Sequence, residues 1–100
     1  MAIVRWTPQA IQDIIDIAEY ISKDSVRYAS LFVVKIFEKE SVLSVSVRVG
    51  RVVPEFGDEN IRELIYQRYR IIYKVISGDR IDILSIFHGS RMLNEDSIFE

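Results

Sequence analysis

The stretch YRIIYKVISGDRIDILSIFH, residues 69–88, contains two runs of β-branched and aromatic residues on either side of a Ser-Gly-Asp-Arg turn. Runs of this composition around a glycine turn predict two antiparallel strands, Tyr69–Ile76 and Ile81–His88. A third run, Ile61–Tyr66, precedes them after only two intervening residues. The three runs together predict an antiparallel meander.

Alternation within the middle run assigns its side chains to two faces, because successive residues of a strand point to opposite sides of the sheet. One predicted face is apolar and aromatic, and the other mixes bases with isoleucines. The first face carries Tyr69, Ile71, Tyr73 and Val75, and the second carries Arg70, Ile72, Lys74 and Ile76. An antiparallel sheet can pack one apolar face against the core while its other face stays in solvent. We therefore expect the second face to be bare and open to a partner.

The sequence before the meander predicts a short strand and two helices. Ile3–Trp6 is β-branched and aromatic, and Thr7-Pro8 then supplies an N-cap and a first helical residue. Apolar residues recur at three-to-four spacing from Gln9 to Ser22 and again after a short polar break, which indicates an antiparallel helical hairpin. The positions that carry this spacing are Ile11, Ile14, Ile15, Ala18 and Ile21, then Ala29, Phe32, Val33, Ile36 and Phe37.

The end of the second helix is ambiguous, because valines and serines alternate after Glu40 as they would in a strand. We expect helix to about Val47 and loop from Gly50 to Asn60, where a proline and a glycine occur. Strand, two helices and three strands give an α+β layer in which the hairpin covers one face of a small, mainly antiparallel sheet. Trp6, at the end of the first strand, is expected to be a core residue.

Composition limits what the domain can do. The chain has 100 residues, a net charge of -2, no cysteine and one histidine, which predicts a single domain over residues 1–100. Disulfides and thiolate chemistry are excluded, and a protein-only zinc site is disfavoured. No phosphate-binding glycine loop occurs, so we expect no metal and no cofactor. The absence of an export signal or a membrane-spanning run predicts a cytoplasmic protein.

One group of side chains could carry chemistry. A histidine among cations could hold a phosphodiester and move a proton, as RNA cleavage requires. The group comprises His88, Arg70, Arg91, Arg62 and Lys74. One histidine supplies one proton transfer, and the second partner would have to be Glu55, Glu63 or a tyrosine. The alternative is that His88 ends a strand and the arginines are exposed sheet residues.

Other conspicuous side chains have structural explanations at this stage. The tyrosines at 66, 69 and 73 could stack on bases, but their alternation within strands favours packing. Asp13, Asp16 and Glu19 fall on the solvated face of the first helix, where we interpret them as solubility charges. Unpaired strand edges and a groove beside the helical hairpin could each accept a segment of a partner protein.

Several motifs in this order resemble the ParE branch of the ParE/RelE toxin superfamily over nearly the whole chain. They are Trp6-Thr7-Pro8, residues 50–56 (GRVVPEF), residues 61–64 (IREL), residues 69–75 (YRIIYKV) and residues 83–91 (ILSIFHGSR). The valine-serine stretch after Glu40 departs from the pattern. The resemblance implies a RelE-like fold and a plasmid-stabilisation toxin of a type II toxin-antitoxin pair, neutralised by a small antitoxin whose C-terminal part wraps the toxin.

Within this superfamily the resemblance leaves two mechanisms. RelE-like members cut mRNA on the ribosome, whereas ParE-like members inhibit DNA gyrase and are not enzymes. The nucleases carry a dense basic face and usually a C-terminal tyrosine. This pattern is weak here, and no tyrosine lies beyond Tyr73. The net charge of -2 also disfavours a ligand of polyanionic RNA. We therefore expect a gyrase inhibitor, with an mRNA endoribonuclease as the alternative.

The expected sites follow from this choice. The bare sheet face and the C-terminal end should contact the target, and the same end would be catalytic in a nuclease. The expected target-binding residues are Arg70, Lys74, His88 and Arg91, of which Arg70, His88 and Arg91 would be catalytic in the nuclease. The antitoxin should cover the apolar rims of the two helices and pair with a strand edge. Its expected contacts are Ile14, Ala18, Ile21, Phe32 and Ile36.

Overall fold

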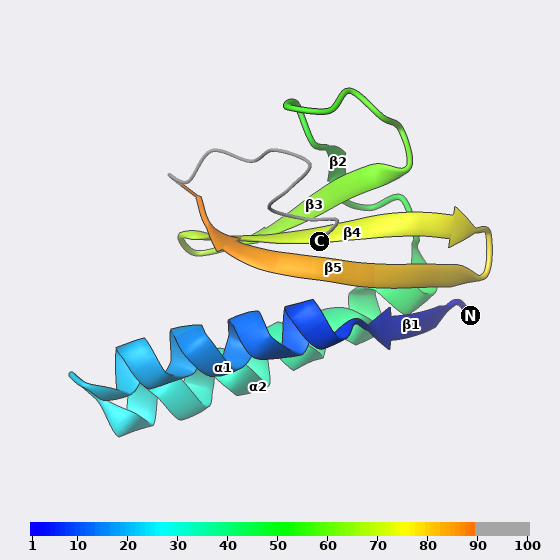
Figure 1. The fold of residues 1–100 in the computed structure, drawn as a ribbon. Helices are drawn as coiled ribbons and strands as arrows, with labels where there is room; N and C mark the ends of the chain where they lie inside the picture. The colour runs from blue at the N-terminus through cyan, green and yellow to red at the C-terminus, as the bar shows by residue number, and fades with distance from the viewer. Residues whose placement is uncertain (90–100) are drawn as a thin grey trace.

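The computed structural model describes residues 1–89, and Figure 1 shows two helices against one side of a twisted sheet. The α+β class and the order of the predicted helices and strands are confirmed. The elements are β1 (Ile3–Trp6), α1 (Pro8–Ser22), α2 (Val26–Val45), β2 (Arg51–Val52), β3 (Ile61–Tyr66), β4 (Tyr69–Ser77) and β5 (Arg80–His88). Neither described helix is long and apolar enough to cross a membrane.

The sheet has the strand order β1-β5-β4-β3-β2, so the predicted meander β3-β4-β5 forms its centre. β1 pairs in parallel with β5, and the other pairs are antiparallel. The prediction that residues 50–60 are entirely loop is wrong at one point. Arg51 and Val52 pair with Glu63 and Arg62 of β3, which makes a two-residue edge strand.

The helices begin where their caps predict. The Thr7 hydroxyl accepts from the Ala10 N–H at 3.3 Å, and Pro8 opens α1. Ser25 caps α2 in the same way by accepting from the Tyr28 N–H. α2 ends at Val45, two residues before the predicted end, because Ser46 turns to an extended conformation. Val47 then packs against the core, which accounts for the apolar alternation in this stretch.

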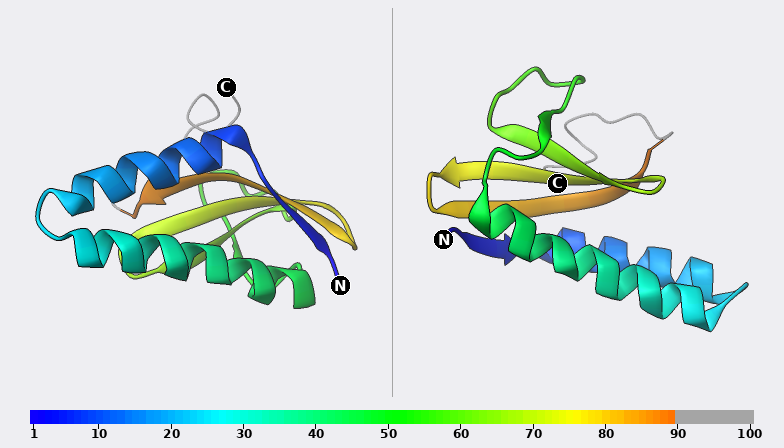
Figure 2. Two further views of the ribbon diagram at one scale, coloured as in Figure 1. Left: turned by 90° about the horizontal axis from the view of Figure 1, so that it is seen from below. Right: turned by 180° about the vertical axis from the view of Figure 1, so that it is seen from behind.

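The main core lies between the helical hairpin and the sheet, and the view from below in Figure 2 shows the two helices side by side across that face of the sheet. Trp6 packs at its margin with its ring 4.7 Å from that of Phe37, and its Nε1–H donates to Glu40 at 2.7 Å. The structural interpretation of Trp6 is therefore confirmed. The buried members of this core are Ala10, Ile14, Phe32, Ile36, Leu43, Ile71, Tyr73, Val75, Ile81, Ile83 and Ile86.

The sheet face turned away from the helices is not bare, which corrects the expectation of an open platform. A second apolar cluster covers it, and two of its members come from the segment after β2. The cluster consists of Val53, Ile61, Ile72 and Phe87, with Phe56 and Leu84 packed against it. We call residues 53–60 the far-face loop; in Figure 1 it rises on the side of the sheet opposite the helices. Two apolar residues of a predicted loop, Val53 and Phe56, thus complete a second layer.

Candidate functional site

Arg70 lies at the centre of an ion network on the far face. Its Nε–H donates to Glu63 Oε1 at 2.5 Å, while its two terminal nitrogens donate to the two oxygens of Glu55 at 2.7 and 2.9 Å. The second carboxylate oxygen of Glu63 accepts from Arg51 Nε. Bidentate and charge-assisted bonds of this kind are the strongest hydrogen bonds that side chains make.

Burial makes the pairing in this network obligatory. The Glu63 side chain is completely buried, and the Arg70 side chain is only 9% exposed. The hydrogen bonding of Arg70 to Glu55 is the largest of the effects that raise the pKa of Arg70 above its ordinary value, and Glu63 adds to it against the opposing cost of burial. The two carboxylates neutralise Arg70 and Arg51, so the network presents no surplus positive charge.

A second set of contacts holds the far-face loop in place. Arg62 donates from Nη1 to the Gly50 carbonyl at 2.9 Å and from Nε to the Glu59 carbonyl at 2.8 Å. Arg48 donates to the Asn60 side-chain oxygen at 3.1 Å. Guanidinium groups that satisfy loop carbonyls replace the backbone pairing that an irregular segment lacks.

The structure does not assemble the predicted cation group. The expectation that Arg70 is exposed on an open face is wrong, because the guanidinium is buried between two carboxylates. Arg62 binds loop carbonyls instead of facing His88. Lys74 is half-buried in β4, and Arg91 lies outside the described residues. Glu55 and Glu63, considered only as proton-transfer partners, turn out to be ion-pair partners of Arg70.

His88 ends β5 at the opposite end of the sheet from the β4–β5 turn. It is exposed, and its ring meets the edge of Tyr69 with centroids 5.9 Å apart. Together with Arg68 it lines a pocket that also contains two carboxylates, those of Asp13 and Asp16. The surroundings of this histidine are therefore of mixed charge and not cationic.

Asp13 corrects a prediction about the first helix. Its Oδ2 accepts from the Ser85 hydroxyl at 2.5 Å and from the Ile86 N–H at 3.0 Å. Asp13 thus links α1 to β5. The contact lies next to a β-bulge, where one extra residue of β5 shifts the register so that Tyr73 pairs with Ile83. Asp16 and Glu19 are exposed, as expected of solubility charges.

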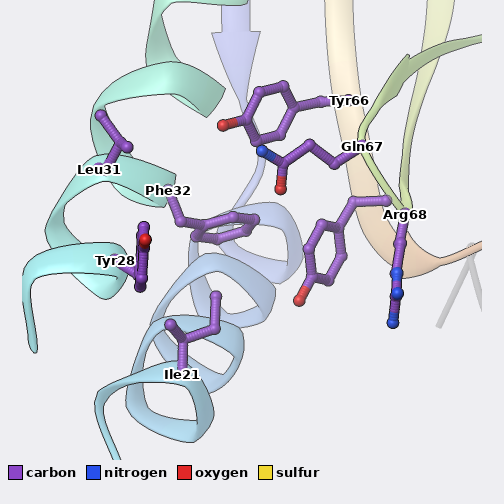
Figure 3. A pocket seen from close by; sticks show the side chains of 8 residues that line it. Ile21, Tyr28, Leu31, Phe32, Tyr66, Gln67 and Arg68 are labelled. Atoms are coloured by element: carbon purple, nitrogen blue, oxygen red, sulfur yellow. The ribbon is translucent and has the colours of Figure 1, made fainter. Parts of the chain in front are cut away.

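A groove lies between the helical hairpin and the β3–β4 turn (Figure 3). Its volume is about 580 Å³. The ring of Phe32 stands 4.9 Å from that of Tyr69 at its base, and Gln67 adopts a positive φ of 53° at the two-residue turn. The groove is lined by Ile21, Tyr28, Leu31, Phe32, Tyr66, Gln67, Arg68 and Tyr69.

The expected antitoxin contacts divide between this groove and the core. Ile21 and Phe32 line the groove, whereas Ile14 and Ile36 are buried beneath the sheet and form no exposed rim. Ala18 packs half-buried against the same core. The exposed apolar residues of the helices are others, including Tyr28, Leu31, Val34, Val42 and Val45. Sequence reasoning missed them because it assigned each helix a single apolar face.

The described part of the chain, residues 1–89, contains no group of three or more His, Cys, Asp or Glu side chains that could hold a metal ion. Arg70 is buried at the far face and paired with two glutamates, whereas Arg68 and His88 are exposed and line one pocket.

A helical hairpin on one face of a five-stranded sheet, with a buried arginine-glutamate network on the other, defines a small α+β domain of the superfamily that the motifs resemble. A family model described as the ParE toxin of the type II toxin-antitoxin system, parDE, matches residues 4–93. The chain belongs to this family.

Comparison with solved structures gives the same fold. One similar chain, described as "Chromosomal ParDE TA system from P. aeruginosa", superposes with a TM-score of 0.70 at 24% sequence identity. The match covers 88% of this chain and 96% of the other. At this identity the likeness shows the fold alone. Comparison with curated protein sequences found no match.

Proposed function

We propose that this chain is the toxin of a toxin-antitoxin pair, that it inhibits DNA gyrase without cutting RNA, and that a cognate antitoxin neutralises it. The observation that carries the choice of mechanism is the state of Arg70. Its guanidinium is buried, and three of its N–H groups donate to Glu55 and Glu63, so two carboxylates already neutralise its charge. A nuclease needs fixed positive charge at the reacting phosphate, and this arginine cannot supply it.

The surroundings of His88 support the same choice. Asp13 and Asp16 lie in the same pocket, and carboxylates beside a histidine repel the phosphates of RNA. Two proton transfers are needed for RNA cleavage, and the chain has one histidine. An RNA substrate would therefore meet negative charge and an incomplete acid-base pair.

The proposed contact with gyrase lies at the end of the sheet that carries Arg68 and His88; it also includes Lys74 on the far face and Arg91, which is outside the described residues. Arg68 lies in the β3–β4 turn, His88 ends β5, and the two line one pocket. Exposed arginine and histidine beside an aromatic ring suit a protein interface. Arg70 takes part as a positioning residue, since it holds the far-face loop through Glu55.

The antitoxin is proposed to occupy the apolar groove at the tip of the helical hairpin. Ile21, Tyr28, Leu31 and Phe32 supply one wall, and the aromatic residues of the β3–β4 turn supply the other. An apolar groove of this kind accepts an amphipathic helix. The edges β1 and β2 remain available for strand pairing.

Two assays on the purified full chain test the mechanism. Gyrase supercoiling of a relaxed plasmid should fall in proportion to toxin added, while messages on translating ribosomes should stay intact. His88→Ala and Arg68→Ala should weaken inhibition by at least several-fold. Arg80→Ala, an exposed arginine at the opposite end of β5 from His88, is the matched control and should inhibit as the wild type does.

If the wild type cleaves the messages and His88→Ala does not, the chain is an endoribonuclease and this proposal is wrong. Unchanged supercoiling at doses that stop growth would remove gyrase as the target. Restored growth on coexpression of the neighbouring small reading frame would test the antitoxin separately from both.

A further inference from the structure

The outer side of α2 carries a regular row of exposed side chains. They recur at spacings of three, four, three, four and three residues, which places all of them along one side of the helix. The row, which we call the outer seam, consists of Tyr28, Leu31, Lys35, Glu38, Val42 and Val45. Its four apolar members are 65%, 44%, 44% and 75% exposed, in that order.

The outer seam is separate from the face that α2 buries. Ala29, Phe32, Ile36 and Leu43 are the buried residues of this helix and lie against the sheet or α1. None of them belongs to the seam. Exposed apolar side chains at coiled-coil spacing on a helix that has already buried another face indicate a second packing surface.

The order of residues along the seam is the same in chemical type from either end. It runs apolar, apolar, charged, charged, apolar, apolar, with opposite charges at its centre. Set antiparallel against a second copy, Tyr28 meets Val45 of the other copy, and Leu31 meets Val42. Lys35 then meets Glu38, twice, across a two-fold axis.

We propose that the outer seam is a homodimer interface in which two copies of α2 pack antiparallel about a two-fold axis. Identical surfaces pair through such an axis only if they are self-complementary. The outer seam is self-complementary because apolar residues meet apolar residues and opposite charges meet each other. Within one chain Lys35 and Glu38 form an ion pair at 3.5 Å. In the dimer each of these side chains pairs with its opposite in the other copy instead, so both charges stay paired. A parallel arrangement would place like charges together.

The interface is small. The seam spans about 26 Å of helix at 1.5 Å per residue, and one helix pair falls in the size class of weak, reversible contacts. Association is therefore expected at high micromolar protein and not at nanomolar protein. The dimer does not depend on the proposed target of the toxin.

A charge-swap experiment on the full chain tests the partner and the register together. Sedimentation should detect a wild-type dimer between low micromolar and about 1 mM protein. Lys35→Glu and Glu38→Lys each put like charges across the axis and should each weaken self-association at least tenfold. An equimolar mixture of these two variants should associate, because every cross-axis pair is then opposite in charge.

The mixture excludes a merely structural role for these residues. Each variant lacks the ion pair within its own helix, and mixing cannot restore that pair. Leu31→Gln should abolish the dimer, whereas Ile15→Gln, an equally exposed isoleucine on α1, should leave it unchanged. A monomeric wild type at the highest concentration overturns the proposal, and so does a mixture that stays monomeric. Seam variants that weaken only antitoxin binding would assign the surface to the antitoxin instead.

Discussion

The two faces of the sheet are covered by different means, although one strand supplies both. Ile71, Tyr73 and Val75 of β4 pack under two full helices, whereas Arg70 and Ile72 lie under a loop of eight residues. Helices bring enough hydrocarbon to fill the space above the sheet. A short loop does not, so the far face is closed by a few apolar contacts and by charges that must be paired.

Three of the motifs that carry the resemblance contribute residues to the far face. The ion network uses Arg51 and Glu55 of the 50–56 motif, Glu63 of the 61–64 motif and Arg70 of the 69–75 motif. These residues are far apart in sequence and meet only when the loop folds back. The motifs therefore describe how this face is held together.

Removing the shared carboxylate should break the far face more than any other single change. Glu63→Gln removes the charge shared by Arg70 and Arg51 and leaves Glu55 as the remaining carboxylate of Arg70, so the unfolding free energy should fall by about 3 kcal/mol, the lower end of the range for breaking a buried ion pair. Urea denaturation measures it. Arg51→Met is the matched control; because the Arg51 side chain is 63% exposed, its loss should cost about 0–1 kcal/mol.

Replacing both Glu63 and Arg70 by apolar residues should have a much smaller effect on stability than removing Glu63 alone. Glu63→Leu combined with Arg70→Met should recover most of the stability, since hydrophobic substitutes for a buried pair are often neutral. A double variant as unstable as Glu63→Gln would show that the network is needed for more than charge balance.

On the helix-covered face, Asp13 makes a polar contact between α1 and β5. Asp13→Ala leaves the Ile86 N–H and the Ser85 hydroxyl without their acceptor, and should cost about 1.5–3 kcal/mol, the range for hydrogen bonds to a charged group. Thermal and urea unfolding would measure the loss. Asp16→Ala, one turn along the same helix and exposed, should be close to neutral.

How far the sequence predicts each face follows from its periodicity. The helices, the meander and the inward side chains of β4 repeat at regular intervals, so the helix-covered face could be predicted nearly completely. The far-face loop has no period, and its contact with Ile72 depends on a chain reversal that no local pattern encodes. The partners of Arg70 lie 7 and 15 residues away along the chain. Glu63 lies between Ile61 and Ile65 on one face of β3. A charged residue between two apolar ones was the available signal that this face is covered and contains a buried polar group.

Gly50 joins the two faces, and its backbone lies close to the side chain of Tyr73. A Cβ at this position would lie 2.5 Å from the Glu63 carbonyl oxygen and 2.7 Å from the Tyr73 hydroxyl. Gly50→Ala should therefore cost about 1–3 kcal/mol, as overpacking does. Gly78→Ala, in a turn where a Cβ would meet nothing within 4 Å, is the matched control and should change unfolding by less than about 1 kcal/mol.

The smallest expected effect concerns the hydroxyl of Tyr73, which accepts from the Gly50 N–H at 2.9 Å. Tyr73→Phe leaves that buried N–H unpaired and should cost about 1 kcal/mol near neutral pH. Burial raises the pKa of Tyr73 above its ordinary value of 10.0, and the Gly50 N–H only partly opposes this.

The pH dependence follows from that direction. Below the unfolded-state pKa the hydroxyl is neutral in both states and stability is complete. As pH rises above about 10 the unfolded chain ionises first, so stability falls until the folded-state pKa is passed, by at most about 1.4 kcal/mol per pH unit. The difference in unfolding free energy between wild type and Tyr73→Phe, measured from pH 8 upward, isolates this group from the lysines and other tyrosines. The wild type should lose its advantage in alkali; a difference that stays constant would mean that Tyr73 ionises alike in both states, and that the junction between the two faces is open to water.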